Sequence, residues 1–271
     1  MLLGIVTACH YTAPSGRESD AMPGAEDDAP LPDSPTSTVA PCSTPDPTGL
    51  VLCLEMEDGV TDGTLLDSSP GRHDATSLSL TPAMRTVPAM SPAAAIGPSS
   101  EIRVAEDPAF DRDAAYTVAL WLRPDTLPPI GSVYGLLDHE QQFAMLLGRS
   151  TAGSLQNRCV HTGVARFEWT ERLPEETWSF LACTWDGTTL CAYRWSATED
   201  TERFCHQPTV LPNTTGVEGI AIGHLSEAGA PHSRFDGALD SVQIYDRGMT
   251  EPQLCALLGR AEGCMPCNSG C

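Results

Sequence analysis

Hydrophobic and polar residues alternate in short stretches through most of this chain. The clearest early example is residues 50–57, where Leu50, Leu52, Leu54 and Met56 fall on one side. Because successive side chains of a strand point to opposite faces of its sheet, this period of two predicts a half-buried strand. Alternating or continuous apolar runs predict further strands at residues 115–123, 133–137, 142–147, 156–161, 165–170, 178–185, 190–195, 219–223 and 238–245.

Turn residues separate the predicted strands, as at Asp62-Gly63 and Asp186-Gly187. Only the end of the pattern favours a helix. Thr250 is placed to cap residues 251–258, and Gly259 follows them. Many short strands with a single late helix predict an all-β, antiparallel sandwich with one short C-terminal helix.

Composition divides the chain into four parts, the first of which is the N-terminal segment of residues 1–9. Residues 10–48 contain eight prolines and few large apolar side chains, so they bury too little surface to offset the entropy cost of ordering. We expect a disordered spacer there that is rich in Pro, Ser, Thr and Asp. One folded domain at residues 49–259 and a Cys-rich tail at residues 260–271 complete the predicted organisation.

Charge narrows the classes of partner. The chain has 15 basic residues, all of them Arg, against 36 acidic ones, and its formal net charge is -21. Proteins bind phosphate groups through clustered Lys and Arg. The acidic net charge therefore argues against nucleic acid as a partner and against electrostatic binding to anionic lipid. No apolar run reaches the ~18 residues of a membrane-spanning helix.

The N-terminal sequence MLLGIVTAC resembles the end of a bacterial lipoprotein signal peptide. In that family the peptide is cut before the Cys of a lipobox, here Cys9, and this Cys then carries lipid. Fewer residues precede Cys9 than a secretory signal needs, so the natural start is expected further upstream. The resemblance implies a secreted protein that is lipid-anchored at the bacterial outer membrane or cell surface. The alternative is an ordinary N-terminal Cys.

The chain has 11 cysteines, and assigning Cys9 to a lipid anchor leaves an even number. An even set of cysteines outside the cytosol favours disulfides and an oxidising compartment. Zinc is the alternative for the tail, where Cys264, Cys267 and Cys271 lie close together. That reading is weaker, because the tail has no His to complete a set of four ligands.

Two disulfides can be predicted from strand positions. Cys191 and Cys205 flank a predicted hairpin, and Cys159 and Cys183 lie on successive strands. Neighbouring strands satisfy the limit of ~7 Å between bridged Cα atoms. The remaining cysteines come from the two ends of the domain, and some of their bonds are expected to staple the first strand to the tail. They are Cys42, Cys53, Cys255, Cys264, Cys267 and Cys271.

Several segments occur in an order that resembles a known family. They are Asp67-Ser68-Ser69-Pro70-Gly71-Arg72-His73-Asp74, YTVALWLRP at residues 116–124, WSFLACTWDG at 178–187, IAIG at 220–223 and FDGALDSVQIYDR at 235–247. Together they resemble the laminin-G-like (LamG) branch of the concanavalin A-like lectin/glucanase superfamily over about residues 50–259. The resemblance implies a jelly-roll β-sandwich of two curved antiparallel sheets.

The sequence departs from the family pattern in two places. After Asp186-Gly187, residues 190–195 continue without the Asn-Gly turn that usually follows, so a disulfide is expected to replace the tight turn there. The Cys-rich tail lies outside the pattern altogether.

The superfamily includes glycoside hydrolases, which need two carboxylates roughly 5 to 9.5 Å apart around the bond they cleave. Their glucanase branch carries the motif Glu-x-Asp-x-x-Glu on one strand, and this chain has no such motif. Glu55 and Glu57 come nearest, on the predicted solvent side of the first strand. Residues 139–143 match the start of an HExxH zinc motif but lack its second His. We therefore expect no catalytic residues.

Calcium is the metal that the resemblance implies, at the point where the early turn approaches the last strand. Asp67 and Asp240 would supply carboxylates, with Glu57 as a further ligand, because calcium prefers oxygen ligands. The alternative is that Asp67 makes a turn hydrogen bond and that Asp240 pairs with backbone or with Arg. No other cofactor is expected.

Exposed aromatic side chains are needed for stacking against sugars. Trp121, Trp178 and Trp185 fall in the buried pattern of the family, whereas Trp169 and Trp195 lie near predicted turns. We take these last two as candidate ligand-binding residues, with core packing as the alternative.

These observations predict a non-catalytic surface recognition module that binds a glycan or protein ligand and touches the membrane only through its lipid anchor. Two alternatives remain open. One is a structural or interaction protein of the bacterial envelope with no sugar site, and the other is an atypical glycoside hydrolase.

Overall fold

The computed structural model describes residues 47–56, 63–87, 90–111, 114–140, 142–153, 155–161, 165–166, 173–196, 202–207, 218–227 and 229–258. The predicted N-terminal segment, most of the predicted spacer and the Cys-rich tail lie outside these ranges. Within them no helix is long and apolar enough to cross a membrane.

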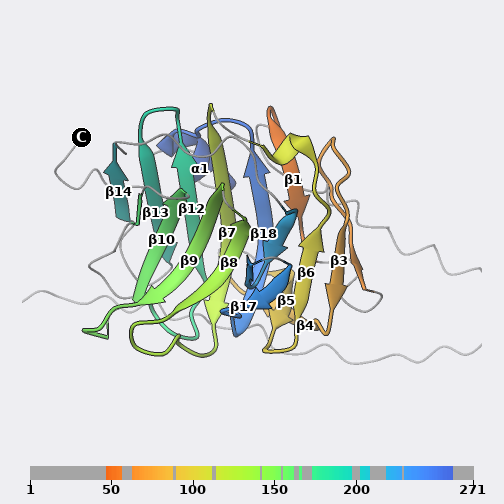
Figure 1. The fold of residues 1–271 in the computed structure, drawn as a ribbon, viewed down its shortest axis with the longest axis vertical. Helices are drawn as coiled ribbons and strands as arrows, with labels where there is room; N and C mark the ends of the chain where they lie inside the picture. The colour runs from red at the N-terminus through yellow and green to blue at the C-terminus, as the bar shows by residue number, and fades with distance from the viewer. Residues whose placement is uncertain are drawn as a thin grey trace, which may run out of the picture. The chain divides into compact units, whose positions relative to one another are not determined.

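Two antiparallel sheets of eight strands each make up the fold (Figure 1). Sheet A has the order β14-β13-β12-β7-β18-β5-β4, and β1 also pairs with β18. Its strands are β1 (Leu50–Leu54), β4 (Thr81–Arg85), β5 (Ser91–Ile96), β7 (Tyr116–Pro124), β12 (Ser179–Trp185), β13 (Leu190–Ser196), β14 (Glu202–His206) and β18 (Gly237–Tyr245).

Sheet B has the order β11-β10-β9-β8-β15-β6-β3-β2. Its strands are β2 (Thr64–Leu65), β3 (Ala75–Leu78), β6 (Glu101–Val104), β8 (Val133–His139), β9 (Phe143–Arg149), β10 (Leu155–His161), β11 (Ala165–Arg166) and β15 (Ile220–Ile222). A small hairpin, β16 (Leu225–Glu227) and β17 (Ala230–His232), follows β15. The predicted all-β antiparallel sandwich is confirmed.

One short α-helix ends the described chain, as the sequence predicts. α1 spans Glu251–Leu257, and Thr250 caps it together with Gln253 in a capping box. A single 3₁₀ turn, η1 (Pro108–Phe110), precedes β7.

The main core lies between the two sheets. Sheet A contributes Val118, Leu120 and Leu122 from β7, and sheet B contributes residues such as Met145 and Ile222. These side chains recur at every second position of their strands, which is the period that the sequence shows. Removing apolar surface from water contributes about 25 cal/mol per Å², so this shared interior holds the sheets together.

A second apolar cluster covers the outer face of sheet A. Trp121, Phe180 and Trp195 face one another across three adjacent strands, because Phe180 pairs in register with both tryptophans. The rings of Phe180 and Trp195 each meet Trp121 edge to face, at centroid distances of 5.6 and 5.4 Å. Leu254 and Leu258 from the C-terminal helical segment belong to the same cluster. Every residue of β12 and β13 is therefore buried.

The outer face of sheet B has a different character. Strand β6 alternates between partly exposed and buried residues, and β9 shows much of the same alternation. In β6 the inward residues are Ile102 and Val104, so Glu101 and Arg103 point outward. Alternation of this kind marks a sheet with one solvated face. Sheet B therefore offers polar side chains to solvent across its outer face, whereas in sheet A only the edge strands β4 and β14 are largely exposed and β12 and β13 are buried.

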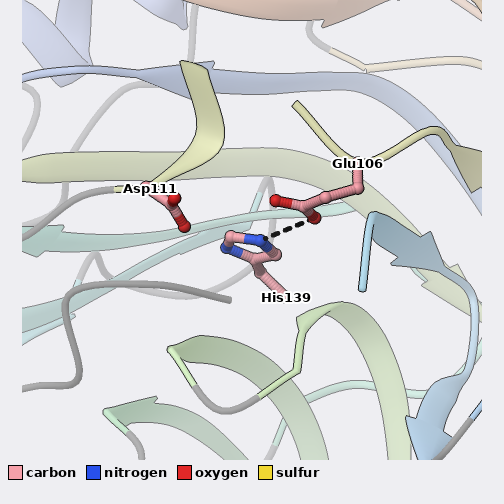
Figure 2. Close-up of side chains that lie close together, drawn as sticks. All are labelled: Glu106, Asp111 and His139. Atoms are coloured by element: carbon pink, nitrogen blue, oxygen red, sulfur yellow. Dashed lines mark hydrogen bonds and ion pairs between the residues drawn. The ribbon is translucent and has the colours of Figure 1, made fainter. Parts of the chain in front are cut away.

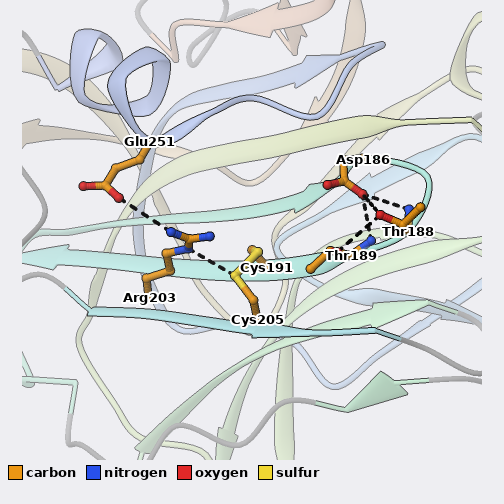
Figure 3. Close-up of a disulfide and its surroundings, with 7 residues drawn as sticks. All are labelled: Asp186, Thr188, Thr189, Cys191, Arg203, Cys205 and Glu251. Atoms are coloured by element: carbon orange, nitrogen blue, oxygen red, sulfur yellow. Dashed lines mark hydrogen bonds and ion pairs between the residues drawn. A yellow bond between two sulfur atoms is a disulfide. The ribbon is translucent and has the colours of Figure 1, made fainter. Parts of the chain in front are cut away.

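Two predicted disulfides are present. Cys191 and Cys205 pair directly across β13 and β14, with a Cα–Cα distance of 4.1 Å (Figure 3). Arg203 of the same edge strand reaches toward Glu251 of α1, at 3.9 Å. Figure 3 also shows the turn before β13, where Asp186 accepts hydrogen bonds from the backbone of Thr188 and Thr189.

Cys159 and Cys183 are also bonded, but the positions predicted for them are wrong. The sequence predicts them on successive, neighbouring strands. Cys159 belongs to β10 of sheet B and Cys183 to β12 of sheet A, and both side chains lie in the main core. The bond thus joins the two sheets through the interior, with a Cα–Cα distance of 5.7 Å.

The other cysteines are only partly described. Cys53 and Cys255 are disulfide-bonded as well, and the predicted staple between the first strand and the tail stays a prediction. Cys42, Cys264, Cys267 and Cys271 lie outside the described residues, so the connectivity predicted for them stays open.

We expect the two described disulfides to stabilise the domain in different ways. Loops of 24 and 14 residues are closed by Cys159–Cys183 and Cys191–Cys205, and closing loops of this size stabilises by about 3 kcal/mol. The double variant C159A/C183A should lose more than this, because it also leaves a space in the core. Denaturant unfolding measures the loss.

The double variant C191A/C205A is the matched comparison. It should lose about 3 kcal/mol or less and increase hydrogen exchange chiefly in β14, because that bond ties an edge strand. Equal exchange in both sheets after its removal would contradict the edge role.

Candidate functional site

Asp67 is fully buried and already has a complete set of donors. Its carboxylate accepts hydrogen bonds from the backbone N–H groups of Cys53 (2.8 Å), Ser69 (2.8 Å) and His73 (2.7 Å) and from the hydroxyl of Ser69 (2.6 Å). These contacts tie the turn at residues 67–73 to β1. They match the predicted alternative, in which Asp67 organises a turn.

Asp240 is also buried and pairs with a cation. Arg85 Nε lies 2.5 Å from Asp240 Oδ2, and the guanidinium also lies over the ring of Trp121 at 4.7 Å. Burial raises the pKa of Asp240, and the charge of Arg85 opposes that rise. The contact again matches the alternative, pairing with Arg. Glu57 lies outside the described residues, so calcium at this set of carboxylates stays a prediction.

The candidate ligand-binding role of Trp195 must be corrected. The residue is 4% exposed and packs against Trp121 in the second cluster. Its ring has no free face for a sugar, because the outer side of sheet A is covered. The predicted alternative, core packing, describes Trp195. Trp169 lies outside the described residues.

A group of charged and polar side chains gathers on the outward side of sheet B. We call it the sheet B cluster, and it comprises Glu101, Arg103, Asp138, Glu218 and Ser226. Arg103 forms an ion pair with Glu101 and donates from Nη1 to Ser226 Oγ at 3.3 Å. Ser226 in turn donates from Oγ to Glu218 at 2.6 Å and from its backbone N–H to Asp138 at 2.9 Å.

Strand register brings this cluster together. Ala221 of β15 pairs with Arg103 on one side and with Asp138 on the other, so these two side chains share a face of the sheet. The hairpin β16–β17 then supplies Ser226. Sequence analysis missed the cluster because its members are spread over more than 120 residues. The alternation of Glu101 and Arg103 with Ile102 and Val104 was the one local signal.

The environment shifts several pKa values within and beside the cluster. Burial raises the pKa of Asp138 to about 6, the Ser226 N–H opposes this, and the charge of Glu140 adds to it. Burial lowers the pKa of the neighbouring His224 to about 4, and the charge of Arg103 adds to that shift. The hydrogen bond from Arg103 lowers the pKa of Glu101. Such perturbed groups are enriched at functional sites.

A separate group of side chains has the composition of a metal site. Glu106, Asp111 and His139 each place one ligand atom within 4.8 Å of the others (Figure 2). His139 is the residue that resembled the start of an HExxH motif. It stands at the end of strand β8 rather than on a helix, so the zinc-protease geometry is absent there.

The comparisons with known proteins identify the fold family. The family model described as the concanavalin A-like lectin/glucanases superfamily matches residues 97–255, more than half of the chain. The chain belongs to this superfamily. Among curated proteins no sequence matches it significantly.

Solved structures with the same architecture come from several kinds of protein. One is domain 4 of AbnA, a GH43 extracellular arabinanase from Geobacillus stearothermophilus, in complex with arabinotriose. It is 17% identical with a TM-score of 0.59, over 77% of this chain and 98% of that one. Another is the binding domain of Paraclostridial Mosquitocidal Protein 1, at 16% identity and a TM-score of 0.58, over 78% of this chain and 52% of that one.

A third similar structure is the binding domain of Botulinum Neurotoxin DC in complex with SialylT. It is 10% identical, with a TM-score of 0.52, over 79% of this chain and 52% of that one. At these identities the likeness shows the fold. The superfamily member described here shares that fold with binding domains and with domains of glycoside hydrolases.

Replacement of Asp138 tests the electrostatics of the sheet B cluster. The carboxyl has a pKa of about 6 when folded against an ordinary value of 3.8. The folded state therefore binds the proton more tightly, and stability falls as pH rises from about 4 to about 6. Asp138→Asn keeps an acceptor for the Ser226 N–H. It should match the parent near pH 4 and exceed it by about 1–3 kcal/mol near pH 8.

Denaturant unfolding at several pH values measures this difference. Asp125→Asn is the matched control, because Asp125 directly follows β7 and its side chain is 43% exposed. Its difference from the parent should not follow the same pH course. An Asp138→Asn variant that is less stable than the parent near pH 8 would contradict the assigned cost of burying the charge.

Proposed function

We propose that this chain is a non-catalytic binding domain that recognises a glycan on the outward face of sheet B. The observation that carries the proposal is the difference between the two outward faces. The central strands of sheet A have their outer face buried in the second apolar cluster. Sheet B presents the sheet B cluster instead, so ligand recognition falls to that side.

The chemistry of the sheet B cluster suits a polyhydroxylated ligand. A sugar hydroxyl both donates and accepts hydrogen bonds, so its site needs cationic donors and carboxylate acceptors close together. Arg103 supplies donors, and Glu101 and Glu218 supply acceptors, with side chains between 22% and 28% exposed. Their mutual contacts fix these groups before a ligand arrives, which lowers the entropy cost of binding.

The similar structures support the class of partner. The arabinanase domain was solved with arabinotriose, and the neurotoxin binding domain with SialylT. The chain covers 98% of the arabinanase domain, so the likeness extends over that whole unit. A binding role in the same fold is therefore established for other chains, and we extend it to this one.

A second function, glycoside hydrolysis, is favoured by one observation. Asp138 has a pKa of about 6, and the nearby charge of Glu140 contributes to it. A carboxyl that titrates near neutrality can act as a general acid, and hydrolysis needs a second carboxylate close by. We rank this function below binding because Asp138 is 8% exposed and already accepts the Ser226 N–H.

The cellular location follows in part from the disulfides. Bonds such as Cys159–Cys183 persist in oxidising compartments, which indicates a secreted or extracellular domain. We further propose that Cys9 carries a lipid anchor that holds the domain at the bacterial envelope. The lipobox-like sequence before it supports this part of the proposal.

Glycan binding by Arg103→Gln tests the proposed face. The purified oxidised chain is screened against an array that includes arabino-oligosaccharides and sialylated glycans, with calcium and again with chelator. We expect binding to a defined sugar class, and the variant should weaken it about tenfold or more, since a hydrogen bond to a charged group contributes about 1.5–3 kcal/mol.

Arg203→Gln is the matched control, because Arg203 lies on edge strand β14 of sheet A with its side chain 39% exposed. Binding that both variants weaken equally would move the site away from sheet B. Cleavage of a bound glycan, abolished by Asp138→Asn, would establish the hydrolase. No glycan binding by the folded chain would favour an envelope interaction protein. Loss of binding with chelator would support calcium at Asp67 and Asp240.

Intact mass tests the anchor. The gene with its natural upstream sequence is expressed in a bacterial host, and the membrane fraction is extracted with detergent. The mature chain should begin at Cys9 and carry added acyl mass, whereas Cys9→Ala should not be acylated. Unmodified parent protein in the soluble periplasm would exclude the anchor.

A further inference from the structure

Glu106, Asp111 and His139 converge from two separate parts of the chain (Figure 2). Glu106 and Asp111 flank the 3₁₀ turn η1, and His139 ends strand β8. The His139 side chain is completely buried, whereas the Glu106 side chain is 40% exposed. His139 Nε2 lies 3.3 Å from Glu106 Oε2. The group therefore reaches from the interior to the solvent.

Gln142 fixes the orientation of the His139 ring. Gln142 is itself fully buried, and its Oε1 lies 3.0 Å from His139 Nδ1. An amide oxygen only accepts hydrogen bonds, so this contact is made when Nδ1 carries a ring proton, and Nε2 is the nitrogen that faces Glu106. A neutral ring with the proton on Nδ1 offers the Nε2 lone pair on the side of Glu106, which is the form in which imidazole binds a metal ion.

The backbone around the two carboxylates is already organised. Asp107 caps η1 by accepting from the Ala109 N–H at 2.7 Å. Phe110, between the two carboxylates in sequence, is buried with its ring against His139 at a centroid distance of 6.4 Å. Gly219 allows close approach on the other side, since a Cβ there would lie 2.7 Å from the backbone N of Glu106.

We infer that Glu106, Asp111 and His139 bind a divalent first-row transition metal ion, with zinc chemistry, through one nitrogen and two carboxylate oxygens. Gln142 acts behind the site as the partner of His139 Nδ1, an arrangement that metal-binding histidines commonly show. The site lies apart from the sheet B cluster and does not depend on glycan binding.

The donor set and spacing favour this class of ion. An imidazole nitrogen suits zinc and its neighbours, whereas calcium and magnesium prefer oxygen throughout. Two ligands about 2.1 Å from a tetrahedral zinc are about 3.4 Å apart, close to the 3.3 Å between His139 Nε2 and Glu106 Oε2. Three protein ligands would leave one position of a tetrahedral zinc for water.

Zinc binding by Glu106→Gln and Asp111→Asn tests the site. The oxidised full-length chain is stripped with chelator and titrated with Zn²⁺ against a chromophoric chelator. We expect one tight zinc per chain, bound roughly tenfold or more weakly by each variant. The visible absorption of Co²⁺ in the same site should show mixed nitrogen and oxygen ligation and should disappear in His139→Gln.

Glu227→Gln is the matched control for the loss of one carboxylate, because Glu227 is exposed in β16. The His139→Gln variant changes a fully buried side chain and can fail to fold. In that case Glu106→Gln still tests the site, because the Glu106 side chain is 40% exposed. Failure to bind zinc would overturn the assignment and leave a His139–Glu106 ion pair. Glu106→Gln and Asp111→Asn could both retain zinc binding, and thiol alkylation could abolish it. That result would place the metal on the tail cysteines and would equally overturn the assignment.

Discussion

Burial of both faces at the centre of sheet A is the constraint on which the rest of this domain depends. Strands β12 and β13 are buried along their whole length, so they need cover on both sides. Sheet B provides it on the inside. On the outside, the helical residues Leu254 and Leu258 share an apolar cluster with Trp121 and Trp195. The centre of a sheet buried in this way has few polar side chains left for a ligand, which is why the proposed recognition lies on the outward face of sheet B.

The same constraint explains how buried charges are treated. A carboxylate removed from water needs donors or a cation nearby. Asp67 obtains three hydrogen bonds from the turn it organises and one from Cys53 of β1. Asp240 obtains Arg85, whose guanidinium also lies over Trp121. Asp138 accepts one backbone N–H from Ser226 and has Glu140 nearby, and its pKa rises to about 6. Carboxylates of one residue type thus have separate roles, decided by their partners.

Local pattern was enough to predict much of the fold. The period of two, the turn residues and the Thr250 cap are properties of adjacent residues, and the predicted strands and the helix follow from them. Sequence analysis predicted no strand at residues 64–104, where β2 to β6 lie, or at the β16–β17 hairpin. Trp195 was misplaced because a strand near a turn gives no sign that its second face will also be covered. Cys159 and Cys183 were paired correctly but placed on one sheet, because chain order does not say which sheet a strand joins. The sheet B cluster needed the register around Ala221, which only the tertiary structure provides.

Strand β8 shows why motif reading fails at such a site. Asp138 and His139 are adjacent in sequence, but the pleat sends their side chains to opposite faces. Asp138 meets Ser226 on the outward face of sheet B. His139 instead turns toward Phe110 and Phe143 in the interior and reaches Glu106 across 33 residues. The HExxH pattern groups His139 with Glu140 as if they belonged to one motif. In the strand, the adjacent residues Asp138 and His139 instead belong to two different groups of side chains, the sheet B cluster and the proposed metal site. The chemistry of Asp138 and His139 is therefore set by strand register and by the segment that each side chain contacts, the β16–β17 hairpin for Asp138 and the residues beside η1 for His139.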